Sequence, residues 1–224
     1  MMILFPRRHK NPLARSVLGI DLSPAFVRLV ELSVDKNGRY ELVNAASEKI
    51  SSRIHSDSAD FGEGTFNEMV GILKSWLNHS ACRSNRAAMS LPFSVATTGT
   101  ISLLESFSHS EREQQIELEI QSQVPYGLDQ AAWDYAVLGP SFTQAGEQDV
   151  QWFAVEKKWV DDRLKLAQAT QLNLAILELD SHIHDLMLSH WIADTSSHSP
   201  QATVAILEIG ETSSKLRLCR HEIV

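Results

Sequence analysis

The sequence predicts an α/β protein made of two consecutive αβ units and a closing hairpin. Apolar stretches of strand length alternate with stretches in which apolar residues recur at helical spacing. Two hairpins of similar layout, at residues 17–32 and 203–219, bracket the rest of the chain. With 43% hydrophobic residues among 224, the chain has enough apolar side chains to form a folded core.

The first unit is expected in the order β-β-β-α-β. The turn at Asn37-Gly38 separates the second strand from the third, because this pair suits a positive φ. A loop rich in Ser, Asp and Gly over 51–64 precedes a helix, and Pro92 ends the last strand. The expected strands are 17–22, 26–32, 40–45 and 87–91. The apolar face of the expected helix consists of Phe66, Met69, Val70, Leu73 and Leu77.

The second unit is expected in the order β-α-β-β-α-β, as one compact αβ insertion. Ser108 and Glu111 have the spacing of a capping box, so a helix should begin there and stop at Pro125. The expected strands are 95–104, 133–138, 149–155 and 172–177, with a second helix over 159–170. After this unit, Asp180 can cap a helix that runs to about residue 193, before a polar linker over 194–201.

Composition excludes several classes of function. The formal charge of −8, from 20 Lys and Arg against 28 Asp and Glu, disfavours binding to nucleic-acid phosphates. The two cysteines, Cys82 and Cys219, have no metal-ligand spacing and indicate a reducing compartment. No apolar run has the length of a membrane span, and the basic residues 7–15 suggest a short solvated tail.

The acidic turns of the two hairpins suggest a phosphate clamp. Turn N–H groups and hydroxyls can bind phosphate oxygens while a carboxylate holds hydrated Mg²⁺. An ordinary hairpin also favours Asp, Ser and Gly in its turn, so this alternative stays open for either turn alone. The candidate cofactor-binding residues are Asp21, Ser23 and Arg28 in the first hairpin and Glu208, Gly210 and Thr212 in the second.

Several motifs in order along the chain, from about residue 13 to the end, resemble one known family. They are Gly19-Ile20-Asp21-Leu22-Ser23, Glu117-Leu118-Glu119, Val124-Pro125-Tyr126, Trp133-Asp134-Tyr135 and Val137-Leu138-Gly139. A helix that ends in Pro-Tyr before an extended segment with Asp beside an aromatic residue is the most specific of these. On these residues the chain resembles the PilM family of type IV pilus assembly proteins.

The resemblance implies an actin-like (ribonuclease H-like) fold of the FtsA type. In that fold subdomain 1A is interrupted by an SHS2-type αβ subdomain 1C, and a second lobe would only begin in this chain. The implied division is a basic tail at 1–12, subdomain 1A at 13–93 and 177–200, subdomain 1C at 94–176, and the opening hairpin of the second lobe at 201–224.

The resemblance also implies a function in recognition. Family members bind the N-terminal cytoplasmic peptide of PilN, an inner-membrane protein, in a groove between subdomains 1A and 1C. This chain would therefore be a cytoplasmic adaptor at the inner face of the inner membrane, in a type IV pilus or DNA-uptake complex. Its partners would be a PilN-like protein and other pilus assembly components, with only indirect membrane contact and no nucleic acid. The exposed edges of the last hairpin would allow self-association.

In the first hairpin Arg28 stands where the family usually has Lys. Three other departures from the family pattern argue against tight nucleotide binding. Glu208 stands where the family has Asp. Pro24 removes an N–H from the turn, and the sequence ends at Val224 without the family's adenosine-binding Gly-Gly segment. We therefore expect this chain to bind the family's ATP and Mg²⁺ weakly or not at all, and we assign no catalytic residue.

Two other functions and a metal site have less support in the sequence. An actin-like ATPase or sugar kinase would need a carboxylate placed to activate water or substrate, and none stands out. An FtsA-like filament protein would normally end in an amphipathic membrane helix, which residues 215–224 do not form. Asp180, His182, His184 and His190 crowd one segment, but positions 182 and 184 point to different helix faces, so no metal site is expected.

Overall fold

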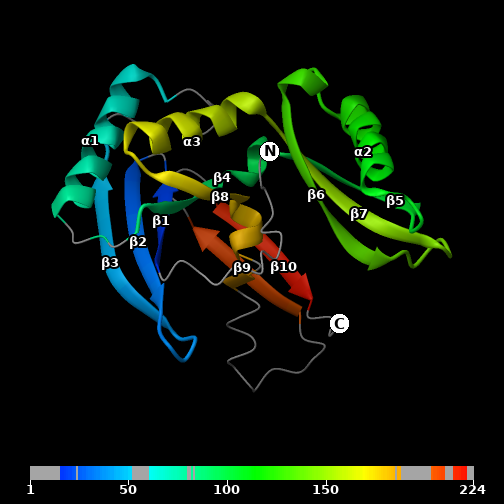
Figure 1. Ribbon diagram of the computed structural model, residues 1–224, viewed down its shortest axis with the longest axis horizontal. Helices are drawn as coiled ribbons and strands as arrows, with labels where there is room; N and C mark the ends of the chain where they lie inside the picture. Colours follow the sequence, from blue (N-terminus) through cyan, green and yellow to red (C-terminus); the bar gives the residue numbers. More distant parts are fainter. Residues whose placement is uncertain are drawn as a thin grey trace.

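A five-stranded mixed sheet forms the larger body of the computed structural model (Figure 1). The structure describes residues 16–23, 25–51, 61–79, 82, 84–184, 186–187, 203–209 and 214–220. The strand order is β3-β2-β1-β4-β8. Strand β1 pairs antiparallel with β2 and parallel with β4, and β4 pairs parallel with β8. The strands are β1 (Ser16–Leu22), β2 (Phe26–Val34), β3 (Tyr40–Lys49), β4 (Arg86–Leu91) and β8 (Asn173–Leu179).

The first three strands arise from alternating apolar residues and a tight turn, as predicted. Leu18 and Ile20 of β1 are buried, while Asp21 on the other face is exposed. In the second turn Gly38 adopts a φ of +78°, and the Asp35 carboxylate accepts hydrogen bonds from two backbone N–H groups after it. Strand β3 extends four residues beyond the predicted end at residue 45, because its pairing with β2 continues to Lys49.

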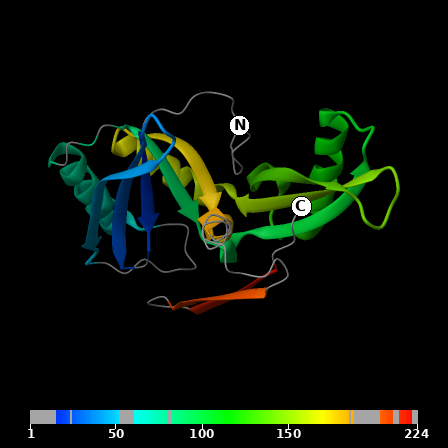
Figure 2. The ribbon, with the colours of Figure 1, turned by 90° about the horizontal axis from the view of Figure 1, so that it is seen from below.

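Two helices cover one face of this sheet (Figures 1 and 2). They are α1 (Glu63–His79) and α3 (Lys157–Ala169). Met69 and Leu73 of α1 are fully buried, and Leu166 of α3 is equally inaccessible. These side chains form one core cluster with Leu18 and Val27 of the sheet. The helix predicted from the spacing of Phe66 to Leu77 is therefore confirmed, with an extra turn at its start.

A fully buried carboxylate, which the sequence analysis did not single out, ties the sheet together. Glu31 of β2 is 0% exposed and accepts hydrogen bonds from Ser16 Oγ at 2.6 Å, Asn44 Nδ2 at 2.6 Å and the Ser84 backbone N–H at 3.1 Å. Burying an ionisable group is tolerated when it is hydrogen-bonded in this way. Glu31 thus joins β1, β2 and β3 to the segment that enters β4.

A separate three-stranded antiparallel sheet, in the order β5-β7-β6, forms the smaller body. Its strands are β5 (Thr97–Leu104), β6 (Ala131–Pro140) and β7 (Glu147–Glu156). Helix α2 (His109–Gln123) lies on one face, where Ile116 and Ile120 pack against Trp152. The predicted capping box is confirmed: Ser108 Oγ accepts from the Glu111 N–H, and the Glu111 carboxylate accepts from the Ser108 N–H. Short 3-10 turns, η1 (Phe93–Val95) and η2 (Leu128–Gln130), precede β5 and β6.

The sequence placed the helix over 159–170 and the strand over 172–177, which are α3 and β8, in one unit with this smaller sheet, and that prediction was wrong. Strand β8 pairs with β4 in the larger sheet, and α3 packs into the larger core through Trp159 and Leu166. The physical reason is that β8 gains a parallel partner and two-sided burial beside β4, which suits its nearly continuous apolar sequence. Antiparallel pairing at the edge of the smaller sheet would leave one of its faces in water.

The last described element is a hairpin of β9 (Thr203–Ile209) and β10 (Ser214–Arg220), which forms its own two-stranded sheet. Residues 180–184 and 186–187, directly after β8, are helical, as predicted from Asp180 onward. The remaining part of that predicted helix, the basic tail, the loop over 52–60 and the turn at 210–213 lie outside the described residues. Among the described helices, none has the length and apolarity required to cross a membrane.

Candidate functional site

In the first predicted phosphate turn, the charged side chains bind each other. Asp21 ends β1 and lies directly opposite Arg28 in the antiparallel register. The Arg28 guanidinium donates to the Asp21 carboxylate at 2.8 Å, and both side chains are about half exposed (44% and 52%). The Arg28 guanidinium also lies 4.9 Å from the Phe26 ring centroid. The cation and the acid that the sequence assigned to a ligand therefore neutralise each other.

The turn's hydrogen-bond donors are used within the turn itself. The Ser23 N–H donates to the Phe26 carbonyl at 3.0 Å, and the Phe26 N–H donates to Ser23 Oγ at 3.1 Å. The Ser23 hydroxyl donates to the same carbonyl at 3.2 Å. Pro24 lies outside the described residues. Ser23 thus closes the hairpin, and the described donors do not form a preformed cradle for a phosphate.

The second predicted turn is described only through Glu208, because Gly210 and Thr212 lie outside the described residues. Glu208 belongs to β9, and its carboxylate lies 3.8 Å from His184 Nδ1 on the helical segment after β8. Within the part of the chain that the structure describes, no hydrogen bond or ion pair joins Glu208 to Asp21 or Arg28. Because two of the six candidate residues lie outside the described residues, the phosphate clamp stays a prediction.

A second region stands out at the junction between the two sheets. The Phe93 N–H, in the η1 connection from β4 to β5, donates to the Asp180 carboxylate at 2.9 Å. The His182 ring lies edge-on to Phe153 of β7, with the centroids 4.6 Å apart. His182 Nδ1 lies 2.8 Å from the carboxylate of Glu178, which is 4% exposed. The start of the helical segment therefore contacts both sheets.

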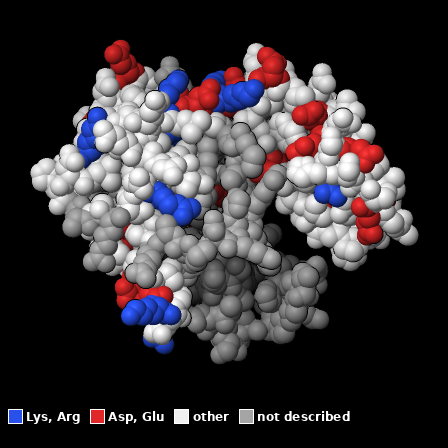
Figure 3. Space-filling model, in the orientation of Figure 1, with Lys and Arg blue, Asp and Glu red and all other residues white. Residues whose placement is uncertain are grey.

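The junction also presents apolar surface. Phe93 is 40% exposed, and Leu186, one helical turn beyond His182 on the same face, is 55% exposed. We call Phe93, Asp180, His182 and Leu186 the junction surface. Phe153, in ring contact with His182, is itself only 1% exposed and belongs to the core. Figure 3 shows the molecular surface indented between the two bodies. Exposed aromatic and aliphatic side chains beside a few oriented polar groups are the usual composition of a peptide-binding surface.

Sequence reasoning predicted a groove between the two units but not these residues. The histidine-rich segment was interpreted only as a possible metal site, although a carboxylate four residues before a histidine can pair with it. Glu178 lies near the end of β8 and His182 in the helical segment that follows, and the two side chains meet at this change of direction. That four-residue spacing was the available signal. No group of three or more possible metal ligands gathers among the residues that the structure describes.

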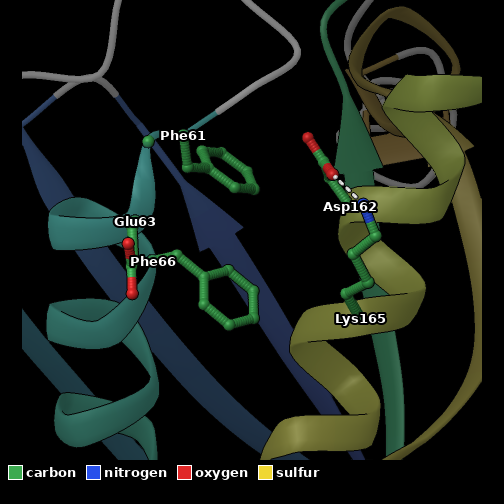
Figure 4. A pocket seen from close by; sticks show the side chains of 6 residues that line it. Phe61, Glu63, Phe66, Asp162 and Lys165 are labelled. Carbon is green, nitrogen blue, oxygen red and sulfur yellow. Dashed lines mark hydrogen bonds and ion pairs between the residues drawn. The ribbon is translucent and has the colours of Figure 1, made fainter.

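One open pocket of about 300 Å³ lies elsewhere, between the start of α1 and α3 (Figure 4). Phe61 and Phe66 line one side, and Asp162 and Lys165 the other. The Lys165 ammonium lies 3.2 Å from the Asp162 carboxylate, so this ion pair is satisfied within α3. The pocket shares no residue with the predicted phosphate turns or with the junction surface.

Comparison with known proteins finds a family model that matches this chain and a solved structure with a similar fold. A family model described as "Type IV pilus assembly protein PilM" matches residues 19–224. A solved structure described as a PilM-PilN type IV pilus biogenesis complex matches with a TM-score of 0.74 at 19% identity, over 94% of this chain and 60% of that chain. The chain therefore spans about 60% of the length of that relative. This match confirms the predicted actin-like α/β fold.

Two remoter likenesses do not by themselves establish a shared fold. The cytoplasmic domain of EpsL, an inner membrane component of the type II secretion system of Vibrio cholerae, matches at 11% identity with a TM-score of 0.48, over 74% of this chain and 57% of that chain. A Bacteroides thetaiotaomicron protein with an actin-like ATPase fold and unknown function matches at 11% identity with a TM-score of 0.46, over 92% of this chain and 66% of that chain.

Proposed function

The chain belongs to the PilM family of type IV pilus assembly proteins, and we propose that it is an adaptor that binds a membrane partner's peptide at the junction surface. The partner would be the N-terminal cytoplasmic peptide of a PilN-like inner-membrane protein. The adaptor would work at the cytoplasmic face of the inner membrane, together with other pilus assembly components. The solved relative is a complex named for PilM and PilN, which supports this choice of partner.

The observation that carries the proposal is the exposed apolar surface between the two sheets. Phe93 is 40% exposed beside its backbone hydrogen bond to Asp180, and Leu186 is 55% exposed one helical turn from the His182–Phe153 pair. Covering such side chains with an apolar peptide removes area from water at roughly 25 cal/mol per Å². The proposed chemistry is recognition, with no covalent step.

The test is a direct titration of a labelled peptide from the N-terminus of a PilN-like protein into the full chain, followed by fluorescence anisotropy. Leu186→Asp should weaken binding at least about tenfold, because a carboxylate would be buried against apolar peptide side chains, at a cost above about 1.4 kcal/mol. Phe142→Asp is the matched control, since Phe142 is fully exposed on the loop between β6 and β7. If both variants bind like the original chain, the junction surface is not the site.

We also propose that the chain binds Mg-ATP weakly or not at all and does not hydrolyse it. The Asp21–Arg28 ion pair and the internal hydrogen bonds of Ser23 support this, because a phosphate would have to displace them. Calorimetry should detect no micromolar affinity for Mg-ATP. Any hydrolysis that Asp21→Ala removes would count against the proposal and in favour of an actin-like ATPase.

Self-association through the last hairpin is a further part of the proposed function. Leu207 and Leu216 are cross-strand partners and are 61% and 67% exposed, and Ile209 and Leu218 are exposed on the same face. An exposed two-stranded sheet with an apolar face invites pairing with a second copy. Light scattering after size exclusion should detect dimers that Leu207→Lys abolishes, and a monomer at all concentrations would contradict this proposal.

A further inference from the structure

One end of the larger sheet exposes apolar and aromatic side chains on the face that α1 and α3 leave open. Val30 and Leu32 alternate along β2 with buried residues that face the helices, so both point to the opposite side of the sheet. Leu42 of β3 lies directly opposite Leu32 in the register. Tyr40 and Leu42 are 70% and 66% exposed, and Val30 and Leu32 are 38% and 40% exposed. We call Val30, Leu32, Tyr40 and Leu42 the open sheet face.

The hairpin of β9 and β10 presents a second apolar face of similar extent. Leu207, Ile209, Leu216 and Leu218 lie on one side of it and are between 61% and 77% exposed. Figure 2 shows the hairpin lying apart from both other sheets. Because the hairpin face and the open sheet face are both exposed in the same molecule, neither covers the other within it. Two apolar faces of one chain are therefore available to a second molecule.

We propose that, in a dimer, the hairpin of each copy packs on the open sheet face of the other copy. This inference rests on the self-association in the proposed function, and it names the surface that the hairpin contacts. Two twisted sheets that pack face to face bury their apolar side chains between them, at a spacing of about 10 Å. Each copy contributes one hairpin and one open sheet face, so the two contacts are equivalent and are related by a two-fold axis.

The exposed area favours this arrangement over the pairing of two hairpins with each other. Each of the eight side chains leaves on the order of 100 Å² in water, so one hairpin on one open sheet face removes roughly 800 Å². Two reciprocal contacts remove roughly 1,600 Å², which is the standard size of a specific protein interface. Two hairpins packed on each other would remove only about 800 Å², which is the size of a crystal-packing contact, and would leave both open sheet faces in water.

The test measures the dimer Kd by sedimentation equilibrium of the full chain and its variants. Leu42→Lys should raise the Kd at least about a hundredfold, because it places a charge in each of two contacts at about tenfold or more for each. Leu42 is largely exposed, so the far-UV circular dichroism of this variant should be unchanged. Phe142→Lys is the matched control, since Phe142 is fully exposed on the loop between β6 and β7, and it should leave the Kd unchanged.

Mixing two variants shows which faces touch. Leu42→Lys keeps an intact hairpin and Leu207→Lys keeps an intact open sheet face, so a dimer of one with the other contains one undisturbed contact. The mixture should form this heterodimer with a Kd at least about tenfold below that of either variant alone. The absence of a heterodimer would overturn the reciprocal contact, because faces that pack like against like cannot complement each other in this way.

The same measurements distinguish a failure of this inference from a failure of the proposed self-association. A dimer that Leu207→Lys abolishes and Leu42→Lys leaves intact would overturn the contact with the open sheet face, while association through the hairpin would stand. A monomer of the original chain at every concentration would overturn both.

Discussion

Replacing Arg163 with methionine should stabilise the fold, which is unusual for a fully buried side chain. Arg163 of α3 is 3% exposed, and its Nε and Nη1 atoms have no hydrogen-bond partner among the residues that the structure describes. The guanidinium lies 4.7 Å from the ring centroid of Phe61 and 5.6 Å from that of Trp159. Methionine keeps the length and flexibility of the side chain and removes the charge.

The magnitude follows from two opposing contributions. Burial lowers the pKa of Arg163 to about 10, and the nearby Asp162 carboxylate opposes this shift without cancelling it. Lowering the pKa of a base by about 2.5 corresponds to roughly 3 kcal/mol against folding of the charged form. Losing the two cation–π contacts costs about 1–2 kcal/mol. We therefore expect Arg163→Met to raise the free energy of unfolding by about 1–2 kcal/mol, or the Tm by about 3–6 °C.

Urea unfolding followed by tryptophan fluorescence measures this difference, with Lys165→Met as control. Lys165 lies on the same helix but is exposed, so its replacement should change stability by less than about 0.5 kcal/mol. Above pH 10 the folded Arg163 begins to lose its proton while the unfolded form keeps it, so the advantage of the methionine variant should shrink as pH rises. A loss of more than 1 kcal/mol at pH 7 in Arg163→Met would refute the reasoning and indicate that the guanidinium has an acceptor.

Two further substitutions test the smaller body. Ser108→Ala should lower the free energy of unfolding by about 1 kcal/mol through loss of the α2 cap. Hydrogen bonds from Ser108 lower the pKa of the Glu111 carboxyl. The capping box should therefore stabilise the fold above the ordinary Glu pKa, and this stabilisation should fade as pH falls below it. A denaturation series from pH 7 to pH 3 in which Ser108→Ala lowers the free energy of unfolding by the same amount throughout would contradict this. Gly99→Ala should destabilise the fold, because a Cβ there would lie 2.6 Å from the Trp152 ring. Gly71→Ala is the control: it lies in open space on α1 and should stabilise the fold by up to about 1 kcal/mol. Changes in Tm of the same sign for both variants would contradict the packing around Trp152.

The local pattern of apolar and polar residues was sufficient to predict most of the secondary structure. The strand pair β1–β2, the helix α1 and the capping box at Ser108 each depend on residues close in sequence, and all three are confirmed. Alternation with period two and recurrence with period 3.6 are properties of a short segment, so they can be read without knowing what the segment packs against. Strand ends were less accurate: β3 continues to Lys49 because its partner strand does.

Pairing between distant segments could not be predicted in the same way. The sequence of β8 is equally compatible with pairing in the smaller sheet and with pairing to β4. It pairs with β4 because that strand offers a parallel partner in a sheet with a covered face. The candidate phosphate residues show the same limit. Asp21 and Arg28 were assigned to one hairpin correctly, but their direct opposition in the register makes them partners of each other.

By itself, the sequence determined the class of the protein, the order of its elements and the family to which it belongs. Only the tertiary structure decided where the surfaces lie. The junction surface depends on the Phe93–Asp180 hydrogen bond, between residues 87 positions apart, and on the contact of His182 with Phe153. Periodicity records which side of a segment is buried, whereas a binding surface is made where segments from different parts of the chain meet, and that meeting is set by the packing of the whole core.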